Sequence, residues 1–155
     1  MSVPVRSPIR LIDPRGQRVG AGASSIVLVL AIAFGLPVLV AVVAIALGVS
    51  STLGTRYFLF GRPWPAIRAR LALAAPAVPE PEVGPRFAQA LGAVALVIGL
   101  AGLVAGSPLG WIPVAIVVAL QATLAVSGYC LGCRIYGLQW WLPDQFDRLI
   151  IRRPS

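Results

Sequence analysis

The only two cysteines of the chain, Cys130 and Cys133, are the residues whose type and spacing most clearly allow chemistry. In the sequence Cys130-Leu131-Gly132-Cys133 they hold two sulfur atoms within reach of each other. Neighbouring thiols can form a reversible disulfide, pass on a persulfide sulfur or bind a soft metal ion. Because the pair closes the last long apolar run, we expect this chemistry at a membrane boundary.

Most other catalytic sites are excluded by the residues that the chain lacks. The absence of His excludes a Ser-His-Asp triad and the usual zinc-protease motifs, and the absence of Lys excludes a phosphate-binding loop with its Lys. No acidic residue lies inside an apolar run, which argues against a proton-coupled transporter. The five acids lie elsewhere: Asp13, Glu80, Glu82, Asp144 and Asp147.

The reactivity of the pair has three interpretations. If both cysteines follow a helix, at positions i and i+3 of one face, Gly132 would ease the small distortion that a disulfide needs. There the helix dipole and apolar surroundings would raise the thiol pKa, whereas Arg134 would lower it. Two thiolates supply half of a tetrahedral metal shell. Redox or sulfur transfer, metal capture and a purely structural role therefore all stay open.

Composition predicts the class of protein. The chain has 155 residues, 58% of them hydrophobic, and a mean hydropathy of +0.88, which is typical of a membrane protein. Its net charge is +8, and all 13 basic residues are Arg, a usage that suggests a bacterial genome rich in G and C. These Arg residues flank the apolar runs, so they indicate the positive-inside rule and a lipid bilayer as partner, not nucleic acid.

The apolar runs predict an all-α polytopic membrane protein with four transmembrane helices in two hairpins. The run Gly20–Ser51 would make a helix about 48 Å long, against a hydrocarbon thickness of roughly 30 Å. We expect a break at Phe34-Gly35-Leu36-Pro37, with one long tilted helix as the alternative. Phe87–Ala105 and Leu109–Tyr129 supply the second hairpin, joined at Gly106-Ser107-Pro108.

This topology divides the chain into five segments. With an even number of spans every Arg falls on one side, and the positive-inside rule makes that side the cytoplasm of a bacterial inner membrane, with both termini there. The Pro- and Arg-rich connector includes a short surface helix near Trp64–Leu73, and Trp140-Trp141 in the tail anchors to lipid or docks a partner. The segments are an N-terminal segment (1–19), a first hairpin (20–55), the connector (56–86), a second hairpin (87–130) and a C-terminal tail (131–155).

Small and polar residues suggest how the helices pack. Gly92, Gly99 and Gly106 recur every seven residues, a spacing that allows close helix contacts within the chain or in a homo-oligomer. Gln121 is expected to make an interhelical hydrogen bond, with a substrate contact as the less favoured role.

Three motifs in order resemble an uncharacterised bacterial membrane family, domain of unknown function 4395. They are Ile12-Asp13-Pro14-Arg15-Gly16, Pro85-Arg86-Phe87-Ala88-Gln89 and Tyr129-Cys130-Leu131-Gly132-Cys133. The resemblance spans Ile12–Tyr136 and implies a small multi-helix membrane protein. Some members are encoded near thioredoxin-like proteins or sulfurtransferases, which implies a thiol or sulfur role for Cys130 and Cys133.

We therefore expect a membrane-anchored dithiol protein with Cys130 and Cys133 as its catalytic residues. The expected activity is thiol–disulfide or persulfide exchange with a cytoplasmic thioredoxin-like or rhodanese-like partner, as a thiol oxidoreductase or a sulfur-transfer accessory protein. No cofactor is expected. A non-catalytic membrane anchor or assembly factor, and a small metal-binding or transport module, are the alternatives.

Overall fold

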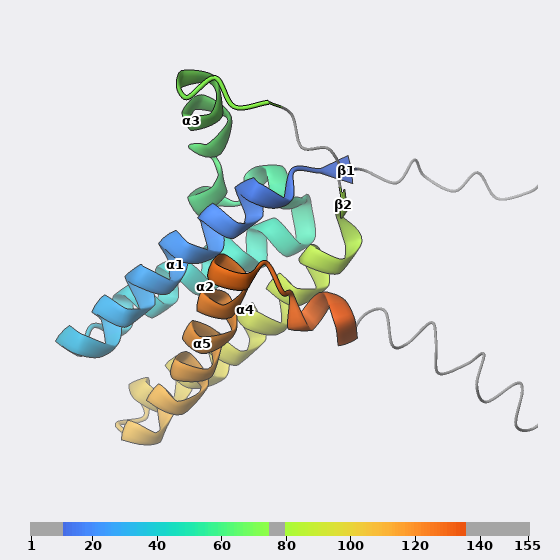
Figure 1. The fold of residues 1–155 in the computed structure, drawn as a ribbon. Helices are drawn as coiled ribbons and strands as arrows, with labels where there is room; N and C mark the ends of the chain where they lie inside the picture. Colours follow the sequence, from blue (N-terminus) through green and yellow to red (C-terminus); the bar gives the residue numbers. More distant parts are fainter. Residues whose placement is uncertain (1–10, 75–79, 136–155) are drawn as a thin grey trace, which may run out of the picture.

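The computed structural model describes residues 11–74 and 80–135, which fold into helices (Figure 1). The predicted all-α class is confirmed, and one antiparallel pair of two-residue strands joins the segments that precede the two hairpins. The α-helices are α1 (Pro14–Phe34), α2 (Pro37–Leu53), α3 (Trp64–Arg70), α4 (Val83–Val104) and α5 (Trp111–Ser127). Short 3-10 helices are η1 (Thr55–Tyr57), η2 (Leu59–Gly61) and η3 (Pro108–Gly110), and the strands are β1 (Leu11–Ile12) and β2 (Glu80–Pro81).

The first apolar run breaks where the sequence predicts. Helix α1 ends at Phe34, and Gly35 takes a left-handed conformation with φ of 62°, which glycine adopts without steric cost. Pro37 is the first residue of α2. A backbone N–H at this position would have no acceptor within the helix, so its absence in proline costs no hydrogen bond. The single tilted helix, the alternative for this run, is therefore wrong.

Three helical segments are long and apolar enough to cross a membrane: Pro14–Phe34, Val83–Val104 and Pro108–Ser127. Helix α2 is also apolar but has only 17 residues, or about 25 Å at 1.5 Å per residue. Its crossing of the bilayer stays a prediction. Helix α1 begins earlier than its apolar run because Asp13 accepts the backbone N–H of Arg15 and Pro14 occupies the first helical position.

The two hairpins pack against each other rather than as separate units. Helix α1 lies mainly along α5, and α2 lies mainly along α4. Each pairing carries a Ser–Gln hydrogen bond: Ser24 Oγ donates to Gln121 Oε1 at a partly buried site, and Ser50 Oγ donates to Gln89 Oε1 at a buried one. The interhelical hydrogen bond expected of Gln121 is thus confirmed. The fully buried side chains between the helices include Leu28, Val40, Val43, Leu96 and Val114.

Glycines allow the closest helix contacts, and these contacts lie within the chain. A Cβ at Gly99 would stand 2.8 Å from the carbonyl oxygen of Gly110, and one at Gly102 would stand 3.1 Å from the Cα of Gly110. A Cβ at Gly92 would lie 3.3 Å from Leu47. Gly92 and Gly99 therefore serve packing against α2 and against the start of α5, whereas Gly106 lies beyond the end of α4 and has no heavy atom within 4 Å of an added Cβ.

One end of the bundle gathers the polar features. The starts of α1 and α4 and the ends of α2 and α5 meet there, beside β1, β2 and α3, while the hairpin tips lie at the opposite end (Figure 1). Two Arg side chains cap helix ends across hairpins: Arg18 donates to the carbonyls of Ala125 and Val126, and Arg86 donates to those of Ser51 and Thr52. Every Arg within the described ranges lies at or near this end: Arg15, Arg18, Arg56, Arg62, Arg68, Arg70, Arg86 and Arg134.

The connector docks on the start of α1 through Asp13. Trp64 Nε1 donates to Asp13 Oδ2 at 2.9 Å, and Arg68 reaches the same oxygen at 3.4 Å. Burial raises the pKa of Asp13, but the hydrogen bonds from Trp64, Arg15 and Arg68 lower it by a larger amount. The pKa of Asp13 therefore lies below its usual value. The short helix expected near Trp64–Leu73 is therefore present as α3. The expected Trp140-Trp141 anchor lies outside the described residues.

Candidate redox site

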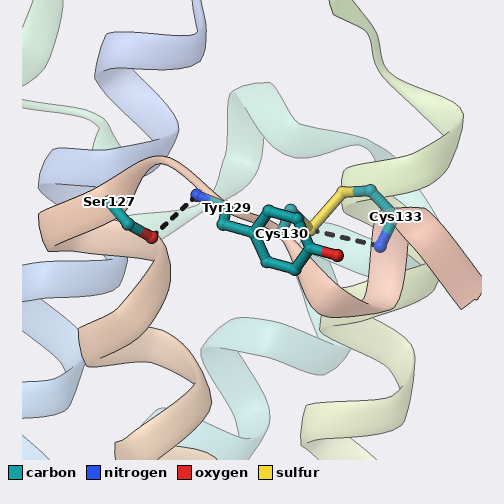
Figure 2. The surroundings of a disulfide bond; sticks show 4 residues. All are labelled: Ser127, Tyr129, Cys130 and Cys133. Atoms are coloured by element: carbon teal, nitrogen blue, oxygen red, sulfur yellow. Dashed lines mark hydrogen bonds between the residues drawn. A yellow bond between two sulfur atoms is a disulfide. The ribbon is translucent and has the colours of Figure 1, made fainter.

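The backbone turns sharply between α5 and the cysteines. Helix α5 ends at Ser127, and Gly128 follows in a left-handed conformation with φ of 73°. The N–H of Tyr129 then donates to Ser127 Oγ at 3.1 Å (Figure 2). A new helical turn spans residues 131–135, and Cys130 stands immediately before it.

The cysteines follow α5 as expected, but they lie beyond its C-terminal cap and at the start of a new turn, so the expected position at a helix C-terminus is wrong. The backbone N–H of Cys133 donates to Cys130 Sγ at 3.2 Å (Figure 2). The N–H of Arg134 donates to the carbonyl of Cys130. Cys130 thus opens the new turn, because Gly128 has already ended α5. The turn thus places a backbone N–H against Cys130 Sγ, where a helix C-terminus would present carbonyl groups.

The two sulfurs are joined in a disulfide, with the Cα atoms of Cys130 and Cys133 5.2 Å apart. This separation lies within the usual range for disulfides, and both residues are half-buried. Across residues 11–74 and 80–135, no group of three or more His, Cys, Asp or Glu side chains could hold a metal ion. In this arrangement the pair can accept two electrons and open to two thiols.

Close packing on α4 fixes the turn that carries the pair. A Cβ at Gly132 would stand 2.6 Å from the Cβ of Ala88 and 2.9 Å from its Cα. A Cβ at Gly84 would stand 3.3 Å from the Cβ of Cys133. Gly132 is thus required for close approach to α4, whereas the sequence suggested that it eases a helix distortion.

Two charged side chains beside the pair have structural partners. The side chain of Arg18 on α1 donates to the last carbonyls of α5. These hydrogen bonds hold the end of α5, just before Cys130, against the first hairpin. The guanidinium of Arg134 lies over the ring of Tyr129, 5.3 Å from its centroid. Arg134 was expected to act on the thiols, and the structure gives it this aromatic partner.

Cys130 lines two hollows of different character. The larger is a partly open cavity of about 260 Å³ lined by α1, α2, α4, α5 and the 131–135 turn, with mostly apolar walls. The smaller, of about 20 Å³, is lined by both cysteines and by the polar side chains Gln17, Arg18 and Glu80. The disulfide therefore borders an apolar cavity and a small polar hollow.

Three amide side chains line the apolar cavity, and the sequence pointed to only one of them. Gln121 was identified as an isolated polar residue of the last apolar run. Gln89 and Gln17 stand at the same cavity from α4 and α1. Gln17 lies in the first turn of α1 and Gln89 in the second turn of α4, each near an Arg, so nothing in the sequence separates them from ordinary surface glutamines.

A family model matches residues 12–140 of the 155-residue chain. The chain belongs to the family described as Domain of unknown function (DUF4395). The resemblance in three motifs is thereby confirmed, and the DUF4395 match continues beyond Tyr136, where the motif resemblance ended, to residue 140. No curated protein and no solved structure matches the chain.

Proposed function

We propose that this protein is a membrane-anchored dithiol that exchanges electrons with a soluble thiol protein through Cys130 and Cys133. The observation that carries this proposal is the disulfide itself, held at the polar end of an apolar helical bundle. A structural staple would add little here, because a disulfide that closes so short a loop constrains the unfolded chain only weakly. A reversible bond at an accessible turn accounts better for the two cysteines.

The exchange follows ordinary thiol–disulfide chemistry. A thiolate of the partner attacks one sulfur, the Cys130–Cys133 bond breaks, and a mixed disulfide forms while the released sulfur leaves as a thiolate. A second thiol of the partner then attacks that mixed disulfide, so the partner is oxidised and the pair becomes two thiols. In the reverse direction Cys130 is the better attacking thiolate, because it receives the backbone N–H of Cys133.

The partner is proposed to be thioredoxin-like, with two thiols, or rhodanese-like, with a persulfide. In the second case the terminal sulfur passes from the partner's persulfide to the Cys130 thiolate, and the partner leaves as a thiolate. The small hollow beside Cys133 supplies polar groups, Arg18 and Glu80, on the side that a soluble protein would approach.

The same proposal places the polar end of the bundle at the cytoplasm of the inner membrane, with four spans and both termini there. Its support is the position of every described Arg at or near this end. In a variant without Cys130 and Cys133, a cysteine introduced at Ser107 should react with a membrane-impermeant maleimide from outside intact cells, and one at Arg70 should not. The reverse pattern would overturn the orientation.

Trapping in cells tests the exchange. With Cys133→Ser, Cys130 keeps its N–H environment but has no resolving thiol, so it should accumulate a mixed disulfide with the partner. The double variant Cys130→Ser/Cys133→Ser is the matched control and should trap nothing at equal abundance. If neither single variant traps a thiol protein or carries a persulfide, the proposal is wrong and the anchor role becomes the better account.

A further inference from the structure

We infer that the apolar cavity beside Cys130 binds the ring of a lipid-soluble quinone, which exchanges two electrons with the Cys130–Cys133 pair. This inference rests on the proposed redox function and adds a second, membrane-side partner to it. It starts from the fact that Cys130 lines both the polar hollow and the apolar cavity. The polar hollow has room for about one water molecule, whereas the apolar cavity is large enough for a small apolar molecule.

The size and closure of the cavity fit one ring system. Its volume of about 260 Å³ is slightly below the usual lower limit for ligand cavities, roughly 300 Å³, which suits a ligand no larger than one ring system. Toward the hairpin tips it ends where α4 and α5 meet, since Gly99 there is in close contact with Gly110 and Val114. Toward the polar end it ends on the turn that begins with Cys130. A bound ring would therefore lie next to the disulfide.

The rim of the cavity leads to the lipid-facing surface. Leu91 on α4 is 46% exposed and Ile116 on α5 is 54% exposed, and both line the cavity. Leu120 on α5 and Ile135 beyond the cysteines are also exposed apolar lining residues. In a bilayer such side chains contact hydrocarbon, so a molecule dissolved in the membrane can enter between α4 and α5 without crossing water.

The amides give the cavity a polarity that suits carbonyl groups. Gln89 is only 6% exposed, and its Oε1 accepts the hydroxyl of Ser50. Gln121 Oε1 likewise accepts the hydroxyl of Ser24. Within the described part of the chain no acceptor is bonded to the NH₂ of either amide, so both donors are free for a ligand. A quinone ring carries two carbonyl acceptors, whereas a lipid acyl chain carries none and would leave these donors unsatisfied.

The redox step balances without any further reactant. The thiols of Cys130 and Cys133 lose their two S–H bonds and form one S–S bond, releasing two electrons and two protons. The quinone takes up both, and its two carbonyl oxygens become the hydroxyls of the quinol. The pair would thus transfer electrons between a soluble thiol protein on the polar side and a quinone on the lipid side.

The test uses the purified full chain in lipid nanodiscs, with the pair first reduced by dithiothreitol and the reductant removed. Decylubiquinone or menadione is added, and quinol formation is followed by absorbance while thiols are counted by mass-tagged maleimide. We expect one quinol for each disulfide formed. The double variant Cys130→Ser/Cys133→Ser should form none.

Two variants test the site itself. Ala95→Leu fills the cavity. Leu91→Trp obstructs its rim from an exposed position that the fold tolerates. For each variant, the rate of quinol formation divided by the rate of its reduction by dithiothreitol should fall at least tenfold. Ala101→Leu is the matched control, because Ala101 is exposed on α4 outside the cavity, and it should behave as the unaltered chain.

The outcomes separate this inference from the function on which it rests. If the pair reacts with dithiothreitol and a soluble thiol protein but not with either quinone, or if both cavity variants keep the full quinone rate, the quinone site is wrong while the dithiol function stands. Recovery of only a lipid acyl chain from the cavity, with no quinone reaction, has the same meaning. If dithiothreitol itself cannot open the pair, the proposed function fails first.

Discussion

Replacing Gly132 by Ala should loosen the turn that holds the disulfide. The new Cβ would stand 2.6 Å from the Cβ and 2.9 Å from the Cα of Ala88, whereas carbon atoms in contact prefer about 3.5–4.0 Å. The turn must therefore move about 1 Å away from α4. Overpacking of this kind costs about 1–3 kcal/mol, and Ala88 belongs to a helix that cannot yield easily.

This cost converts to a rate that can be measured. A destabilisation of about 1–3 kcal/mol raises the population of the displaced turn about 5- to 150-fold, and the rate at which dithiothreitol reduces the disulfide should rise with it. Mass-tagged maleimide after timed quenching measures that rate. The double variant Gly132→Ala/Ala88→Gly should recover most of the original rate, because it removes the opposing Cβ.

A matched control uses a glycine with free space around it. No heavy atom lies within 4 Å of a Cβ built at Gly48, in the middle of α2, so Gly48→Ala should leave the reduction rate unchanged. The same change adds about 0.5–1 kcal/mol of helix stability. If Gly132→Ala reduces no faster than Gly48→Ala, or if the Ala88→Gly change fails to restore the rate, the packing argument is refuted.

Three further predictions concern the contacts around the site. Because the pKa of folded Asp13 lies below its usual 3.8, ionised Asp13 stabilises the folded state above pH 3.8, and this stabilisation is lost as the pH falls through the folded pKa. Trp64 fluorescence should follow this transition, and Asp13→Asn should abolish it. Arg18→Gln removes the guanidinium from the end of α5, and hydrogen exchange of the segment before Cys130 should become faster by roughly tenfold; an unchanged rate would contradict the cap. Glu82→Ala leaves the N–H of Thr55 without its acceptor and should lower the unfolding free energy by about 1–3 kcal/mol, measured in denaturant; no change would contradict it.

Sequence and structure agree where the determining interactions are local. The break between α1 and α2 was predictable because Gly35 and Pro37 act on their own backbone, and the helical class followed from the long apolar runs. The spacing of Cys130 and Cys133 allowed a disulfide as one of three interpretations, and the structure has that disulfide. None of these features depends on which helices become neighbours.

The structure differs from the expectations drawn from the sequence where contacts between segments distant in the sequence determine the conformation. Gly128 ends α5 before the cysteines, so Cys130 begins a turn instead of ending a helix. Glu82 belongs to a proline-rich connector, yet it is buried because its carboxylate accepts both the N–H and the hydroxyl of Thr55 across the bundle. The cavity arises from four helices at once, so the nearness of Gln17 and Gln89 to Cys130 has no signature in the sequence.

The central claim is that the pair cycles between a disulfide and two thiols in the cell, and the most direct test is its thiol state in intact bacteria. Cells producing the full chain would be quenched in acid and labelled with mass-tagged maleimide before, during and after an oxidant pulse, with Cys130→Ser and Cys133→Ser marking the single-thiol positions. The account predicts that Cys130 and Cys133 gain and lose labelling together and reversibly. Cysteines that stay fully labelled through the pulse, or fully blocked before and after it, would contradict it.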